Sequence, residues 1–209
     1  SYFFGNINFS IIISHLVKRD VRREGSGNPG TMNMLRSFGV KLGALTLVLD
    51  AIKGAVPAII GWWLLGGTPD NPMSEMVMFG TDKTGLFIGG IGVVLGHIFP
   101  VVYKFKGGKG VLVGAGAALA TEPLVCAVLL GIFLIEVAVT RIVSLGSIII
   151  AALYPVGTLI NLIARGANAA TIVFSTVCCV IMAAMVIWLH RSNIERLKNG
   201  TEYRFGQKK

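Results

Sequence analysis

The chain of 209 residues is strongly apolar, with 54% hydrophobic residues, 14% charged residues and a mean hydropathy of +0.74, whereas soluble domains average roughly 25% charged residues. Its apolar runs are too long for barrel strands and do not alternate with polar residues, which excludes a soluble single-core domain and favours an all-α integral membrane protein. The net charge of +9 does not indicate a nucleic-acid partner, because the basic residues lie in short loops between apolar runs, where they orient a membrane protein.

Seven apolar runs follow one another along the chain. They cover residues 2–17, 42–65, 85–102, 111–121, 124–139, 145–163 and 169–189. The first run falls short of a ~30 Å hydrocarbon core, and the chain opens with Ser1 instead of methionine, so we expect residues to precede it. A polar loop at 66–84 separates the second and third runs and is expected to lie away from any site.

Charged residues within apolar runs are costly and are therefore expected to be paired. Asp50 and Lys53 lie one helical turn apart, so we expect them to pair with each other or to face a site. Glu136 is expected to pair with a base such as Arg141. We interpret both pairs first as structural support, and the closely spaced glycines within the runs as positions of close helix packing.

Residues 111–139 allow two interpretations, either one kinked helix or two short helices that turn at Glu122 and Pro123. Two helices give seven spans and place 16 lysines and arginines on one side and only Lys83 and Arg165 on the other, with Lys53 inside an apolar run. One helix gives six spans and divides these bases 10 against 8. The positive-inside rule therefore predicts seven transmembrane helices, with the N-terminus outside and the tail in the cytoplasm. The short run 111–121 would be shielded by neighbouring helices or be re-entrant.

The first candidate motif, at 25–37, reads Gly-Ser-Gly-Asn-Pro-Gly-Thr-Met-Asn-Met-Leu-Arg-Ser. Glycines let main-chain N–H groups approach a ligand, and Pro29 with Gly30 favours a turn. Asn33 is expected to cap a following helix, with Arg36 one turn inside it. N–H groups at a helix start beside an arginine suit a phosphate, although an ordinary loop between two helices explains the stretch about equally well.

The second candidate motif, at 103–110, reads Tyr-Lys-Phe-Lys-Gly-Gly-Lys-Gly. Its glycines and lysines resemble a nest of N–H groups that cradles a phosphate, and the spacing excludes a Walker A motif. A lysine belt at the membrane surface is the alternative, but such a belt would not need paired glycines. His97 lies inside the preceding run, where a polar residue is a functional candidate unless it is a packed, hydrogen-bonded histidine.

Two further polar segments fall on the same predicted side of the membrane. The turn at 140–147 contains Ser144, which we expect to cap the next helix, and the tail is expected to form a basic helix that could lie on anionic lipid. His15 and Asp20 satisfy the His-x4-Asp pattern of coenzyme-A-dependent acyltransferases, but this two-residue pattern occurs by chance and lacks a soluble α/β domain here. All candidate polar clusters thus fall on the cytoplasmic side, which favours a site there.

Three longer motifs occur in order along the chain. They are Ser26-Gly-Asn-Pro-Gly-Thr-Met-Asn-Met-Leu-Arg36, Gly96-His-Ile-Phe-Pro100 through Phe105-Lys-Gly-Gly-Lys-Gly110, and His190-Arg-Ser-Asn-Ile-Glu-Arg-Leu-Lys-Asn-Gly-Thr-Glu202. Together with Asp50-x-x-Lys-Gly and Arg141-x-x-Ser-Leu-Gly, they closely resemble the bacterial acyl-phosphate:glycerol-3-phosphate acyltransferase family of the PlsY type. One departure is Gly30-Thr-Met-Asn33, where the family usually has Gly-Ala-Thr-Asn.

The resemblance implies one membrane-embedded acyltransferase domain over residues 1–209, with seven helices, in the bacterial cytoplasmic (inner) membrane and with its active site facing the cytoplasm. It implies transfer of a fatty acyl group from acyl phosphate to the 1-hydroxyl of sn-glycerol 3-phosphate, giving lysophosphatidic acid and phosphate in the first step of phospholipid synthesis. The expected partners are these substrates and the lipid bilayer, with no cofactor or metal, and we expect a monomer. A transporter or channel for a phosphorylated metabolite is the alternative, which would tend to show related halves and a midplane site.

We expect direct transfer without an acyl-enzyme, because no Ser-His-Asp or Cys-His arrangement is evident and acyl phosphate is already activated. Either His97 or the donor's own phosphate would take the hydroxyl proton. The residues expected to orient the reacting groups are His97, Ser144 and Asn193. The expected substrate and phosphate ligands are Ser26, Gly27, Asn28, Gly30, Asn33, Arg36, Lys106, Gly107, Gly108, Lys109, Gly110, Arg196 and Glu202.

Overall fold

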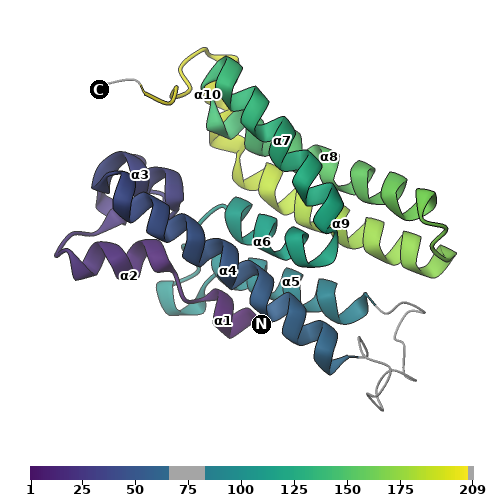
Figure 1. Ribbon diagram of the computed structural model, residues 1–209. Helices are drawn as coiled ribbons and strands as arrows, with labels where there is room; N and C mark the ends of the chain where they lie inside the picture. Colours follow the sequence, from purple (N-terminus) through teal and green to yellow (C-terminus); the bar gives the residue numbers. More distant parts are fainter. Residues whose placement is uncertain (66–82, 207–209) are drawn as a thin grey trace. The chain divides into compact units, whose positions relative to one another are not determined.

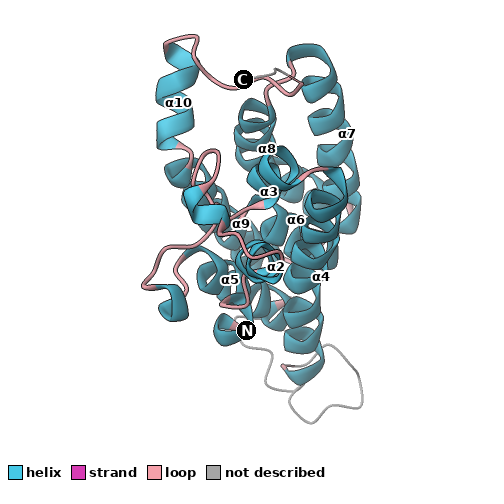
Figure 2. Ribbon diagram, turned by 90° about the vertical axis from the view of Figure 1, so that its left-hand side faces the viewer, coloured by secondary structure: helices cyan, strands magenta, loops and turns pink. Residues whose placement is uncertain are grey.

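The computed structural model describes residues 1–65 and 83–206, so the polar loop expected at 66–84 lies almost wholly outside the described residues. Within these two ranges every regular element is a helix (Figure 2), which confirms the all-α class. Five helical segments of the described chain are long and apolar enough to cross a membrane, as in a multi-pass integral membrane protein. They are Val40–Leu64, Thr84–Tyr103, Pro123–Thr140, Val143–Ala164 and Ala169–Leu189.

The described chain divides into two compact units, one ending at Thr121 and one beginning at Glu122. The boundary coincides with a helix break, because α6 (Val111–Thr121) ends there and α7 (Pro123–Thr140) begins one residue later. Proline at the first helical position costs little, since its missing N–H would have no partner within the helix. Of the two interpretations of this region, two separate helices are therefore confirmed.

The first unit is organised around α4 (Val40–Leu64), which packs against α3 (Thr31–Phe38), α5 (Thr84–Ile98) and α6 (Figure 1). Glycines permit these close contacts, because a Cβ added at Gly89 of α5 would collide with the main-chain carbonyl of Pro57 in α4. The interpretation of the glycine spacing as close helix packing is therefore confirmed.

The first apolar run does not form one continuous helix. This run forms α1 (Tyr2–Gly5) and α2 (Phe9–Leu16), with a break between them. Asn8 begins α2, because its side-chain oxygen accepts a hydrogen bond from the N–H of Ile11 at 3.2 Å. A polar N-cap inside an apolar run thus ends the expected span early, and α1 packs against α5 while α2 contacts α4.

In the second unit, α8 (Val143–Ala164) packs against α7 and against α9 (Ala169–Leu189). The short helix α10 (Arg191–Lys198) follows α9 and carries Arg196 and Lys198 in its last turn. The helix expected in the basic tail is therefore confirmed.

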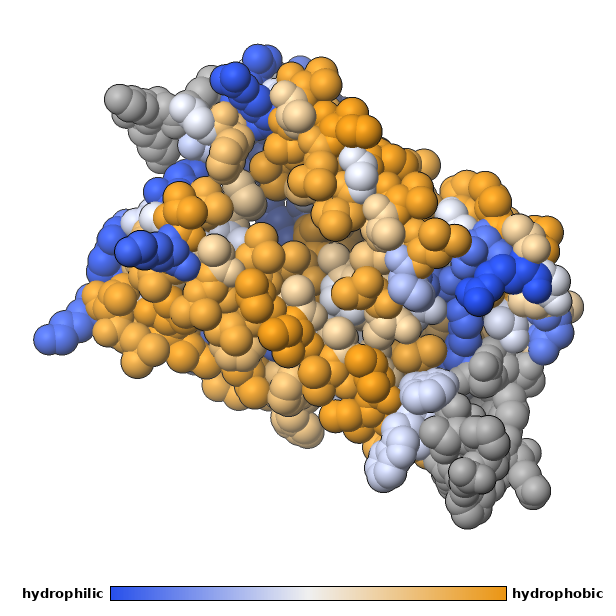
Figure 3. All heavy atoms as spheres, viewed as in Figure 1, coloured by the Kyte–Doolittle hydropathy of each residue, from blue (hydrophilic) through white to orange (hydrophobic). Residues whose placement is uncertain are grey.

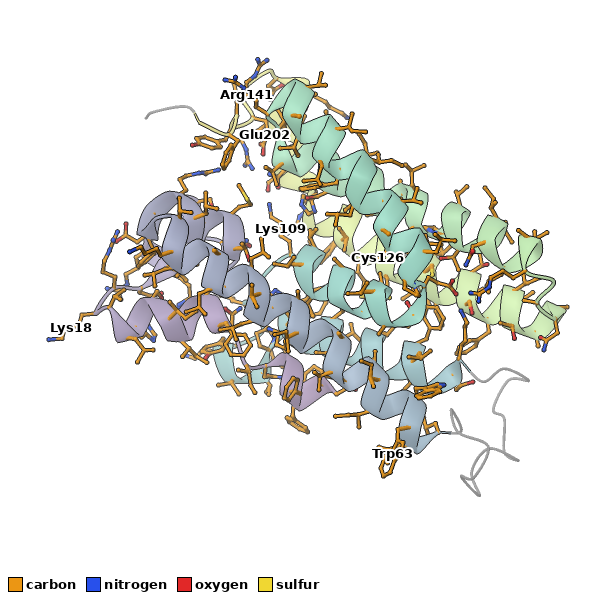
Figure 4. The ribbon with its side chains drawn as sticks, in the orientation of Figure 1. Lys18, Trp63, Lys109, Cys126, Arg141 and Glu202 are labelled. Carbon is orange, nitrogen blue, oxygen red and sulfur yellow. The ribbon has the colours of Figure 1, made fainter. Side chains whose placement is uncertain are left out.

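Hydrophobic side chains cover the outer face of α4 in the first unit and of α7 in the second (Figure 3). Trp63 on α4 is 62% exposed and Val139 on α7 is 79% exposed. Apolar surface of this extent suits contact with lipid. Within the first unit, Lys18 and Trp63 lie at opposite ends (Figure 4).

Candidate active site

The first motif leads into α3, and the start of this helix differs from the prediction. α3 begins at Thr31 with Gly30 as its N-cap, whereas Asn33 lies in its first turn, so the prediction that Asn33 caps the helix is wrong. Arg36 lies in the last turn of α3 and is half-buried. The physical reason for the difference is that the Asn33 side chain is committed to the preceding loop.

Asn33 holds that loop together with four hydrogen bonds and is itself buried. Its amide nitrogen donates twice and its amide oxygen accepts twice, which uses the whole capacity of the group. The partners are the carbonyls of Val21 and Glu24, both at 2.9 Å, the N–H of Ser26 at 3.1 Å and the hydroxyl of Ser37 at 3.4 Å. Asn33 therefore shapes the loop and keeps no hydrogen-bonding group for a phosphate.

The loop itself places small and polar residues just before α3. Gly27 has a φ of +70°, a left-handed conformation that glycine adopts without strain. The hydroxyl of Ser26 lies 3.5 Å from the N–H of Asn28, which donates to it. Asn8, the residue that caps α2, donates from its amide nitrogen to the carbonyl of Pro29 at 3.4 Å. The start of α2 thus supports the turn of the first motif.

The second motif folds back onto the end of α5. The N–H groups of Gly107 and Gly108 donate to the carbonyls of Ile98 and His97, both at 3.2 Å. These carbonyls at the helix C-terminus have no partner within α5, so the glycine loop satisfies them. Two N–H groups of the expected nest are therefore hydrogen-bonded to carbonyl groups of α5. The positive charge of this motif comes from its lysines.

The first two motifs meet at one edge of His97, which lies in the last turn of α5 and is 3% exposed. A Cβ added at Gly108 would collide with Nε2 of His97 and would lie 2.9 Å from the carbonyl oxygen of Pro29. Gly108 therefore fills a gap that no larger residue fits. Residues from two separate motifs are brought together here within the first unit.

The opposite edge of His97 contacts Lys53. Nζ of Lys53 lies 2.9 Å from Nδ1 of His97, donates to the carbonyl of Ile7 at 2.7 Å and lies 3.3 Å from Oδ1 of Asp50. The pairing expected of Asp50 and Lys53 is confirmed. The contact between Lys53 and His97 was not predicted from the sequence. The only sign of it in the sequence is that a lysine lies inside an apolar run, where it needs a partner.

Glu202 gathers the polar side chains of the second unit. Its Oε1 accepts hydrogen bonds from Oγ of Ser144 at 2.7 Å and from Nδ2 of Asn193 at 2.6 Å, and its Oε2 accepts one from Nε of Arg196 at 2.7 Å. Burial favours the neutral carboxyl, but these hydrogen bonds outweigh it and hold the pKa of Glu202 below its usual value. Three predicted site residues are thus brought together by a fourth, Glu202. Its negative charge suits the N–H and O–H donors of these residues and does not suit a phosphate, which is also negatively charged.

Two local predictions in this unit are wrong. Ser144 does not cap α8, because Ile142 is the N-cap and the hydroxyl of Ser144 points to Glu202 instead. Glu136 accepts a hydrogen bond from Oγ1 of Thr140 at 2.6 Å rather than pairing with Arg141. The carbonyl of Arg141 accepts a hydrogen bond from the tail, so Arg141 and Glu202 lie at the same end of this unit (Figure 4).

The His-x4-Asp pattern near the N-terminus forms a surface turn. Both carboxylate oxygens of Asp20 accept hydrogen bonds from Arg22, at 2.8 to 3.2 Å, and these bonds hold the pKa of Asp20 well below its usual range. Nε2 of His15 lies 3.8 Å from the same carboxylate, and its side chain is 52% exposed. The geometry thus explains the pattern as an exposed ion pair.

Five apolar helical segments, together with clusters of Gly, Lys, Arg, Ser and Asn residues at helix ends, define an integral membrane protein equipped for anionic substrates. A family profile described as glycerol-3-phosphate acyltransferase matches residues 1–200. The chain belongs to this family and is a membrane-embedded glycerol-3-phosphate acyltransferase.

Relatives of the same description match along more than nine tenths of their own length. The glycerol-3-phosphate acyltransferase of Clostridioides difficile (strain 630) is 36% identical over 100% of this chain and 94% of its own, and that of Paraburkholderia phymatum is 39% identical over 100% and 91%. The fold is similar to crystal structures of PlsY, an integral membrane glycerol 3-phosphate acyltransferase. Its glycerol 3-phosphate form is 32% identical, with a TM-score of 0.77, and the match covers 98% of this chain and 92% of that structure's chain. Its lysophosphatidic acid form is also 32% identical, with a TM-score of 0.76 and coverage of 98% of this chain and 91% of the other. These matches confirm the PlsY-type resemblance and favour an enzyme over a transporter.

Proposed function

We propose that the chain transfers a fatty acyl group from acyl phosphate to the 1-hydroxyl of sn-glycerol 3-phosphate, giving lysophosphatidic acid and inorganic phosphate. The family supports the acceptor and the reaction class, and the solved PlsY structures are forms with glycerol 3-phosphate and lysophosphatidic acid. The observation that carries the proposal is the meeting of the first two motifs at His97, because it sets two glycine-rich, basic loops side by side. Both substrates carry a phosphate, which such loops suit.

Acyl phosphate is the proposed donor because the basic loops are compact. The loop at 103–110 has eight residues and the turn at 140–144 has five. The described chain consists of membrane helices and short connections, without a soluble domain to hold an adenine nucleotide. A compact phosphate fits these loops, and the acyl tail would lie among the apolar helices.

We divide the predicted site residues by role. We assign phosphate and polyol binding to Ser26, Asn28, Arg36, Lys106 and Lys109. We assign close approach of the main chain to the substrates to the glycines of the two loops, namely Gly27, Gly30, Gly107, Gly108 and Gly110. Asn33 and Glu202 position their neighbours, Arg196 supports Glu202, and His97, Ser144 and Asn193 orient the reacting groups.

The proposed reaction is a single displacement at the acyl carbonyl carbon. The 1-hydroxyl oxygen of glycerol 3-phosphate forms a bond to this carbon, the bond to the phosphate oxygen breaks, and the phosphate leaves with the electron pair. The hydroxyl proton passes to the donor's own phosphate. An acyl-enzyme is not needed, since acyl phosphate is already activated and the Ser144 hydroxyl donates to the carboxylate of Glu202, which also holds Arg196.

We place the protein in the bacterial cytoplasmic membrane, as a monomer with its N-terminus outside, its tail inside and its active site facing the cytoplasm. The 16-to-2 division of basic residues over seven apolar segments supports this topology. Two of these segments, 2–17 and 111–121, form helices too short to cross alone, so they would be shielded by longer neighbours.

Two substitutions test the site assignment. Purified protein is given palmitoyl phosphate and glycerol 3-phosphate, and lysophosphatidic acid is measured by mass spectrometry. Arg36→Ala is expected to lower turnover about ten-fold to over a hundred-fold, since a hydrogen bond to a charged group contributes about 1.5–3 kcal/mol. His15→Ala, at the exposed ion pair, is expected to keep native turnover. A folded Arg36→Ala protein with near-native turnover, or an inactive His15→Ala protein, would contradict the assignment.

A further inference from the structure

Lys53 lies against His97, although the proposed mechanism gives it no task. Its side chain is 0% exposed, in the middle of α4. Nζ donates to the carbonyl of Ile7 at 2.7 Å, lies 2.9 Å from Nδ1 of His97 and forms an ion pair with Asp50, whose Oδ1 lies 3.3 Å away and accepts no hydrogen bond. The ring of Phe9, whose centroid lies 5.6 Å from Nζ, adds an attractive π face. A lysine kept at such a position inside a membrane helix calls for a function.

The surroundings of Nζ determine which nitrogen of His97 carries the proton. The ion pair with Asp50 favours Nζ as an ammonium group, which carries three N–H donors and has no lone pair to accept with. The neighbouring carboxylate of Asp50 stabilises this charged form. Nδ1 of His97 must then be the acceptor, so the single proton of the neutral imidazole resides on Nε2.

Nε2 is the ring nitrogen that faces Gly108, where the first two motifs meet. We propose that Lys53 is a positioning residue that locks His97 in the Nε2–H tautomer, so that His97 donates a hydrogen bond to a substrate oxygen at the glycine loop. The lone pair of the ring is directed at Lys53, so His97 does not take the hydroxyl proton. This role rests on the proposed function for the identity of the oxygen, which belongs to a phosphate or to the acyl carbonyl.

The tautomer can be measured without any substrate. Nitrogen-15 NMR of histidine-labelled protein in detergent micelles reports which ring nitrogen is protonated, and the signals of His97 are assigned by their loss in His97→Gln. We expect protonated Nε2 and unprotonated Nδ1 in the wild type, and loss of this preference in the double variant D50N/K53M, which removes both buried charges together. Protonated Nδ1 in the wild type, or an unchanged preference in the double variant, would overturn the proposal.

A kinetic cycle separates positioning from a merely structural role. Glutamine at position 97 presents an N–H donor near the place of Nε2 but has no tautomers, so H97Q is expected to keep at least about ten-fold more turnover than H97A. D50N/K53M is expected to lower kcat about ten-fold or more with His97 present, but less than about three-fold in the H97Q background. Equal losses in both backgrounds, or H97Q no more active than H97A, would overturn the proposal.

The two measurements also separate this proposal from the proposed function. A wild-type protein without acyltransferase activity would refute the proposed function, whereas the tautomer of His97 is read from the unliganded protein. If D50N/K53M does not fold, the wild-type tautomer and the comparison of H97Q with H97A still decide the matter.

Discussion

Replacing Glu202 with glutamine would keep the shape of the second cluster and remove its charge. Ser144 and Asn193 both donate to Oε1 of Glu202, at 2.7 and 2.6 Å. A hydrogen bond to a charged group contributes about 1.5–3 kcal/mol and a neutral one about 0.5–1.5 kcal/mol, so each bond weakens by about 1 kcal/mol. Two bonds give ~2 kcal/mol, or about 30-fold in rate. Arg196 adds little, because it is 45% exposed and its ion pair is screened by solvent.

The assay measures kcat and KM for glycerol 3-phosphate in purified Glu202→Gln protein. If Glu202 positions Ser144 and Asn193, kcat is expected to fall about 30-fold with little change in KM. Glu195→Gln, at a neighbouring exposed glutamate on α10, is the matched control and is expected to keep native kcat. Native kcat in a folded Glu202→Gln protein, or a change in KM alone, would refute the reasoning, and the second result would make Glu202 a substrate ligand.

Three further predictions follow from the contacts and charges. Gly108→Ala is expected to remove most turnover, because the new Cβ would collide with Nε2 of His97. Gly131→Ala, whose new Cβ would have nothing within 4 Å, is the control and is expected to keep native turnover. Equal turnover in the two variants would contradict the contact between Gly108 and His97. Wild type is expected to melt at a higher temperature than Glu202→Gln, with the largest difference above pH 4.5. The difference should shrink as the pH falls through the lowered pKa of Glu202, because the carboxylate then becomes neutral. An unchanged difference in strong acid would refute this expectation. In intact cells, with the native cysteines replaced, a cysteine at Asn71 should label from outside and one at Lys208 should not; the reverse would contradict the topology.

Local chemistry made part of the fold predictable from the sequence. The lengths of the apolar runs predicted membrane helices, and the spacing of Asp50 and Lys53 predicted their pairing. Each of these depends on residues close together in the chain. The break inside the first run, where the polar residue Asn8 caps α2, was not foreseen from the sequence.

The contacts of the candidate site depend on residues far apart in the chain, which periodicity does not bring together. Lys53 and His97 are 44 positions apart, and Ser144 and Glu202 are 58 apart. Asn33 was expected to act as a cap because asparagine often does so, but its real partners include carbonyl groups, which carry no signal in the sequence. The sequence therefore identified the segments that make these contacts, whereas the partner of each side chain came only from the structure.

Comparing two acyl donors in one experiment tests the central claim most directly. Purified protein is given glycerol 3-phosphate with either palmitoyl phosphate or palmitoyl-coenzyme A, and lysophosphatidic acid and inorganic phosphate are measured together. We expect product from palmitoyl phosphate alone, with one phosphate released for each acyl group transferred. Product from palmitoyl-coenzyme A at a comparable rate, or acyl transfer without release of phosphate, would contradict the account.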